Sequence, residues 1–270
     1  MKNRLLISMQ IVICLGLMFD GAAAKQSGSQ VIKSCVNSSQ CNKFGMEALT
    51  KRDFLKARHY FWWQARYAED EQDKKAMLLA YNNLADLHEK QREYSLALVW
   101  IYQARRIDGH DPSMLRELNM IQRKMKASKW PTAATGTYIR YAGKAYWDAL
   151  CIGERSDGEA SVFLYMILFT SNWRTGPATE DMLQGITHIQ DGKAVFAGDS
   201  EKPKCTINMK FSSESIQLEQ DGECSIDYRL SSTGIYHRIS TQVCNKDSIP
   251  LPIDRYNGNV GAKNSLPVLH

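Results

Sequence analysis

The sequence predicts an α+β protein of two domains, an N-terminal all-α helical array followed by a C-terminal antiparallel β-barrel or compact sandwich. Two different sequence patterns along the 270 residues support this division. Across residues 41–129 apolar side chains recur at helical spacing, and Pro112 is the one internal proline. Across residues 136–240 the chain shows short β-branched and aromatic runs between glycine-containing turns. We expect the domains to be 41–129 and 134–244.

The N-terminal residues 1–24 have the pattern of a secretory signal peptide. Two basic residues, Lys2 and Arg4, precede an apolar stretch over 5–19, and small residues end the segment. An uncleaved membrane anchor is the alternative, but Asp20 closes the apolar stretch well short of the roughly 20 residues that a membrane span needs. We expect a periplasmic or secreted protein with no stable transmembrane anchor.

Cysteine usage agrees with export. Loss of Cys14 with the signal peptide leaves an even number of cysteines, which indicates disulfides in an exported chain. The six are Cys35, Cys41, Cys151, Cys205, Cys224 and Cys244. If the run between the fourth and fifth forms a hairpin, those two lie nearly opposite each other. The pairs that remain are Cys151–Cys244 and Cys35–Cys41. Paired CxxC motifs are absent from the sequence, so a zinc site is not predicted.

Residues 81–109, YNNLADLHEKQREYSLALVWIYQARRIDG, form the clearest helical unit. They resemble a tetratricopeptide repeat, a pair of antiparallel helices about 34 residues long. The anchor positions of that repeat are held by Tyr81, Leu84, Ala85, Ala97, Ile101 and Ala104. A second copy precedes it, in which Ala57 corresponds to Ala97. The two alanines are 40 residues apart, and we expect the extra length, in the segment EDEQDK, to lengthen either a loop or the next helix.

A further helix follows the second repeat. Leu115 and Leu118 continue its apolar spacing, Asp111 can cap it, and Pro112 suits its first turn. No partner helix follows because Trp130 and the proline after it end the pattern. We therefore expect two repeats and a closing helix, a minimal stable array.

The resemblance implies a concave groove, lined by the first helix of each repeat, that binds a peptide or helix of a partner protein. The residues expected to face it are Asn42, Met46, Asn82, Asp86, Arg116 and Met120. Some members of the family clamp a peptide carboxylate with basic or amide residues. Of the corresponding positions Asn42, Met46, Asn83, Ser113 and Glu117, only Asn83 fits. A carboxylate clamp is not predicted.

Two adjacent tryptophans, Trp62 and Trp63, lie in the first repeat. Neighbouring residues on a helix point about 100° apart, so both rings cannot face the same core. We expect one of them to be exposed or to meet the second domain.

The second half carries eight short strands with turn signals between them, which favours one barrel or sandwich. The expected strands are Thr137–Tyr141, Tyr146–Ile152, Ser161–Leu168, Leu183–Ile189, Ala194–Ala197, Thr206–Phe211, Ser215–Leu218 and Ile235–Ser240. The first and last contain near-copies, GTYIRYA and GIYHRIS. We expect these two strands to lie side by side and close the sheet, which hides its edges.

The strand motifs of residues 134–240 are similar to those of small barrel domains in bacterial envelope proteins, such as lysozyme inhibitors and lipocalin-like modules. In such inhibitors a loop bearing serine and lysine enters the enzyme's cleft. Residues 141–144, YAGK, are the loose candidate for that loop here.

Nothing in the sequence indicates catalysis. The histidines are scattered, and no GxSxG, HExxH, P-loop or GxGxxG motif is present. The net charge of +5 is too small to favour nucleic-acid binding, and we expect no cofactor. Residues 25–40 are expected to be a linker and 245–270 a flexible tail.

The expected function is that of a non-enzymatic, protein-binding module exported to the bacterial envelope. Two alternatives share this architecture: an envelope inhibitor or immunity protein against a wall-active or toxic enzyme, and a small-ligand or lipid carrier in the barrel. A buried cluster of histidine, aspartate or glutamate at the domain junction would instead favour an enzyme.

Overall fold

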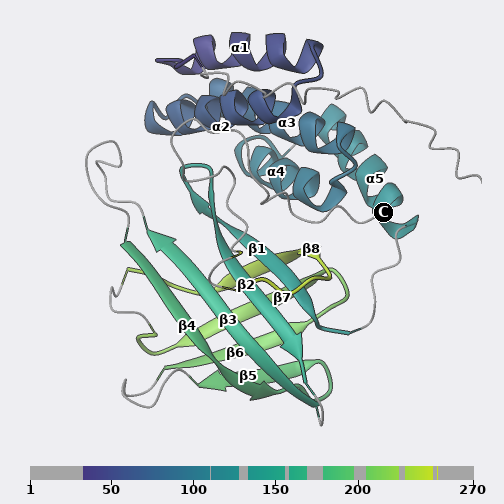
Figure 1. The fold of residues 1–270 in the computed structure, drawn as a ribbon, viewed down its shortest axis with the longest axis vertical. Helices are drawn as coiled ribbons and strands as arrows, with labels where there is room; N and C mark the ends of the chain where they lie inside the picture. Colours follow the sequence, from purple (N-terminus) through teal and green to yellow (C-terminus); the bar gives the residue numbers. More distant parts are fainter. Residues whose placement is uncertain are drawn as a thin grey trace, which may run out of the picture.

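The predicted fold class is confirmed by a computed structural model of the chain, shown in Figure 1. The residues described are 33–109, 111–127, 133–155, 158–168, 179–197, 205–224, 229–245 and 248. They form helices followed by an antiparallel, nearly closed barrel. The expected signal peptide lies outside them, as do half of the linker and most of the tail. The first helix begins at Ser38, within the expected linker, so the array starts earlier than predicted.

The described helices fall where apolar periodicity placed them. They are α1 (Ser38–Thr50), α2 (Phe54–Asp70), α3 (Lys74–Lys90), α4 (Tyr94–Ile107) and α5 (Pro112–Ala127). Short polar side chains cap the N-termini of α1 and α5: Asn37 accepts a hydrogen bond from the N–H of Gln40, and Asp111 from that of Ser113, both at 2.8 Å. The predicted cap and first-turn proline of α5 are confirmed.

The first three connections between helices are the same tight turn. One residue in each has a positive φ of 54° to 63°, and the next donates its N–H to the carbonyl five residues back at 2.8 to 3.0 Å. The residues with positive φ are Arg52, Gln72 and Arg92. The turns recur every twenty residues. The length beyond a 34-residue repeat therefore lies in the helices, not in a loop.

The barrel strands match the eight expected runs. They are β1 (Gly136–Gly143), β2 (Tyr146–Glu154), β3 (Glu159–Leu168), β4 (Thr179–His188), β5 (Lys193–Ala197), β6 (Thr206–Phe211), β7 (Ser215–Asp221) and β8 (Gly234–Ser240). Their order in the sheet is β4-β3-β2-β1-β8-β7-β6-β5. The first and last strands are paired, with Ile139 opposite His237, as predicted.

The two outer strands of this order, β4 and β5, are joined by a turn at Asp191–Gly192. The hydroxyl of Thr187 in β4 donates to the carbonyl of Val195 in β5 at 2.8 Å, so the sheet curls until its edges nearly meet. Large side chains fill the interior as one contact cluster. It includes Tyr138, Leu150, Leu164, Phe196, Ile207, Ile216 and Tyr236.

Three disulfides join the cysteines in the expected pairs: Cys205–Cys224, Cys151–Cys244 and Cys35–Cys41. They indicate an oxidising compartment, extracellular or periplasmic. Among the described helices, none combines the length and apolar character that crossing a bilayer requires.

The helices and one end of the barrel share a core cluster, which is separate from the cluster in the barrel interior. In Figure 1 the array covers one end of the barrel, with α1 on the side away from it. Trp100 of α4 packs edge-on against Trp147 of β2 at 4.5 Å between ring centroids, and Tyr102 stacks on His237 at 4.8 Å. The indole N–H of Trp62 donates to the carbonyl of Ala145 at 2.8 Å. Trp62 is thus the tryptophan that meets the second domain.

Candidate functional site

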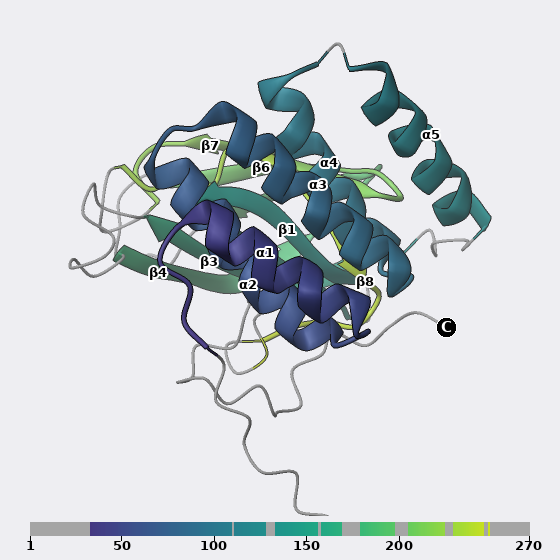
Figure 2. The same cartoon turned by 90° about the horizontal axis from the view of Figure 1, so that it is seen from above.

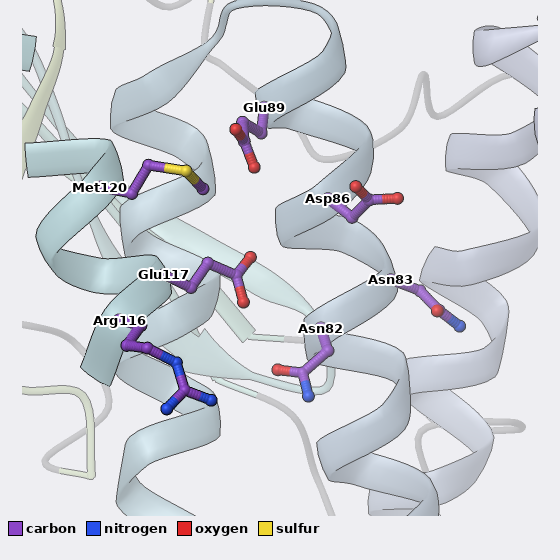
Figure 3. A pocket seen from close by; sticks show the side chains of 7 residues that line it. All are labelled: Asn82, Asn83, Asp86, Glu89, Arg116, Glu117 and Met120. Carbon is purple, nitrogen blue, oxygen red and sulfur yellow. The ribbon is translucent and has the colours of Figure 1, made fainter. Parts of the chain in front are cut away.

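An open cleft of about 500 Å³ lies between α3 and α5 (Figure 3). It is lined by Asn82, Asn83, Asp86, Glu89, Arg116, Glu117 and Met120. The view from above in Figure 2 shows α5 set off to one side of the array, beyond α3. Every lining residue belongs to α3 or α5, so the cleft is formed by helices alone.

Helical periodicity explains why these side chains meet. Residues 82, 86 and 89 lie on one stripe of α3, and 116, 117 and 120 lie on one stripe of α5. Leu84 of α3 and Leu118 of α5 face the other way and are buried in the core. Burial of the apolar stripes thus turns the polar stripes of the two helices toward each other.

The lining carries three carboxylates and one guanidinium. Lys90 pairs with Asp86 one turn away on α3, and Lys124 reaches from α5 to Glu89 at 2.5 Å. Glu117 makes no ion pair within the part of the chain that the structure describes. Its pKa is raised, first by burial and then by the negative charges of Glu89 and Asp86, against the opposing effect of Lys90.

Asn82 adds a buried acceptor to this charge. Its side-chain oxygen is excluded from solvent and has no hydrogen-bond partner among the described residues. A buried acceptor without a partner costs about 1–3 kcal/mol. In Figure 3 its side chain and that of Glu117 point into the gap between the helices. A donor entering the cleft would meet both.

Four of the six residues expected to face the groove line the cleft: Asn82, Asp86, Arg116 and Met120. The other two do not. The side-chain oxygen of Asn42 on α1 accepts from the amide of Asn83 at 2.8 Å, and Met46 lies exposed one turn further along α1. α1 therefore does not line the cleft itself, and it contacts the lining residue Asn83.

The remaining lining residues, Asn83, Glu89 and Glu117, were not among the expected groove residues. Asn83 and Glu117 occupy two of the positions considered above for a carboxylate clamp. Glu117 cannot serve there because an acidic side chain repels a carboxylate. Glu89 follows Asn82 by seven residues and so lies on the same helical stripe, a spacing that could have identified it.

A second polar cluster lies at the junction of helices and barrel, around the buried carboxylate of Glu69. It accepts hydrogen bonds from the backbone N–H of Lys144 at 2.6 Å and of Ala145 at 3.2 Å, and from the hydroxyls of Tyr81 and Tyr141. Burial raises the pKa of Glu69, although these hydrogen bonds act in the opposite direction. The cluster joins the helices to the barrel through the carboxylate of Glu69.

The candidate inhibitor loop 141–144 is the tip of the β1–β2 hairpin. This tip is docked among the helices: Lys144 and Ala145 form its turn at φ of 51° and 57°, and Ala145, directly after the candidate loop, is fully buried. Lys144 also pairs with Asp70 of α2 at 3.6 Å. A loop held in this way is not exposed to enter an enzyme's cleft.

Over the described residues, no group of three or more histidine, cysteine, aspartate or glutamate side chains is placed to hold a metal ion. Comparisons of the chain with known protein families, with curated proteins and with solved structures find no match. The cleft between α3 and α5 remains the candidate site on geometric grounds.

Proposed function

We propose that this protein is an exported, non-catalytic binding protein of the bacterial envelope, and that the cleft between α3 and α5 binds a segment of a partner protein. One observation carries the proposal. Polar and charged side chains line an open cleft on helices whose other faces are occupied by the core, and one buried acceptor there has no partner in the part of the chain that the structure describes. The resemblance of the helices to tetratricopeptide repeats points the same way.

The cleft is preformed, which favours binding without a large ordering cost. The amide of Asn83 donates to Asn42 on α1 at 2.8 Å and to the buried Gln64 on α2 at 3.0 Å, so three helices share one polar contact. The barrel braces the array from the opposite side through its docked hairpin. The barrel's role in this proposal is to hold the helices in place.

The two alternative functions have less support. The inhibitor's candidate loop, residues 141–144, is half-buried and docked against the helices. The barrel interior is occupied by one cluster of contacting side chains, whereas a carrier needs an open apolar interior.

Photo-crosslinking tests the proposal in the cells that make the protein. A photoreactive residue is placed at Met120 or at Arg116 in the cleft, and at Gln217, an exposed residue of β7, as the control. We expect both cleft positions to yield the same crosslinked protein and Gln217 not to yield it. Equal labelling from all three positions, or none from the cleft, would contradict the proposal.

A further inference from the structure

The partner's chemistry follows from the acceptors of the cleft. We propose that the cleft recognises an arginine side chain presented by the partner segment; this rests on the proposed function. The guanidinium would lie between Glu117 of α5 and the oxygen of Asn82 on α3. Its aliphatic stem would lie along Met120, since long charged side chains bury their methylenes on apolar surface.

The acceptors come from both walls. Glu117 projects from α5, while Asn82 and Asp86 project from α3, one turn apart (Figure 3). Acceptors on opposite sides suit a planar group with several N–H donors, because one guanidinium can bond to both walls at once. A lysine ammonium is a compact and strongly hydrated charge, so it satisfies separated acceptors less well.

The charge of the lining also selects a cation. Asp86, Glu89 and Glu117 outnumber Arg116, which lies exposed at the rim and remains solvated. Lys90 and Lys124 are already paired with Asp86 and Glu89, which leaves Glu117 as the acid of the lining without an ion pair in the described chain. A carboxylate or phosphate would be repelled here, and an uncharged group would leave Glu117 uncompensated.

Burial and like charge both act against ionised Glu117, as the raised pKa of this residue reflects. The positive charge of a bound guanidinium would offset both effects, and its N–H groups would also satisfy the oxygen of Asn82, which has no partner among the described residues. Hydrogen bonds to charged groups contribute about 1.5–3 kcal/mol, equivalent to roughly ten- to hundredfold in affinity.

The experiment selects peptides from a random display library on the full, oxidised chain. Selected peptides are then measured by fluorescence anisotropy against the wild type, Glu117→Gln and the control Glu71→Gln, which alters an exposed acid outside the cleft. We expect the selected sequences to share an arginine. We expect binding to weaken at least tenfold with Glu117→Gln and to be unchanged with Glu71→Gln. Replacing the arginine with citrulline, which is neutral and nearly isosteric, should weaken binding to a similar extent.

The outcomes separate this inference from the proposed function. Peptides without a shared basic residue, whose binding nevertheless falls when Met120 is replaced by glutamate, would overturn the arginine proposal and leave the binding cleft standing. Full binding to Glu117→Gln would also overturn it. If no selected peptide depends on Met120 or Glu117, both proposals fail.

Discussion

Glu69 offers the most direct test of how the two halves are held together. Its side chain is 7% exposed and accepts four hydrogen bonds, two from backbone N–H groups of the β1–β2 turn and two from tyrosine hydroxyls. Glu69→Ala removes both carboxylate oxygens at once. The turn would keep its positive φ values. The N–H of Lys144 would lose its partner, whereas that of Ala145 would keep the hydroxyl oxygen of Tyr141 at 3.0 Å.

The cost can be worked from the donors that are left. Each buried backbone N–H without a partner costs about 1–3 kcal/mol. The hydroxyls of Tyr81 and Tyr141 lie 3.3 Å apart and can bond to each other, so they add little. Removal of the carboxylate also relieves the burial that raises its pKa, which offsets part of the loss. We expect a net loss of about 2 kcal/mol in the free energy of unfolding.

Urea unfolding followed by tryptophan fluorescence measures this loss, because Trp62, Trp100 and Trp147 lie in the shared core. The matched control is Glu71→Ala, two residues along the chain and exposed, which should change stability by less than about 0.5 kcal/mol. A loss below about 1 kcal/mol for Glu69→Ala would refute the view that this carboxylate locks the hairpin to the helices.

Three further outcomes are expected. Burial lowers the pKa of His237 from 6.5 to about 4, so between these pH values the unfolded chain binds more protons than the folded chain. The free energy of unfolding of the wild type should therefore fall by about 1–2 kcal/mol between pH 7 and pH 5. His237→Phe should not show this loss in urea titrations. Gly45→Ala should lower the melting temperature although alanine favours helices, because the new methyl group would collide with the ring of Phe61. Replacing Cys151 and Cys244 with serine should cost about 4 kcal/mol in chemical unfolding, since their disulfide spans 93 residues and constrains the unfolded chain. Unchanged midpoints would contradict each expectation in turn.

Local pattern accounted for the elements of the fold. Alternation in Thr206–Phe211 and helical spacing around Ala97 depend on neighbours within a few residues, so the sequence shows them directly. The hairpin between Cys205 and Cys224 likewise determines which cysteines meet, because pairing Thr206 with Asp221 brings them together.

Contacts between the halves could not be predicted in the same way. Glu69 and Lys144 are far apart in the chain, and no local sequence pattern around either residue indicates that the two will be in contact. A turn containing glycine and lysine has the composition of a solvated loop, and only a carboxylate from another element makes its burial possible. The cleft was predicted in part, because the register of α3 is local whereas the setting of α5 against it depends on packing.

The docked hairpin also bears on how such a chain can change over generations. A recombination event that exchanged only the array or only the barrel would leave Trp100 and Trp147 facing an unmatched surface. The halves that read as separable along the sequence are therefore expected to be inherited together, and substitutions at their contact to arise in compensating pairs.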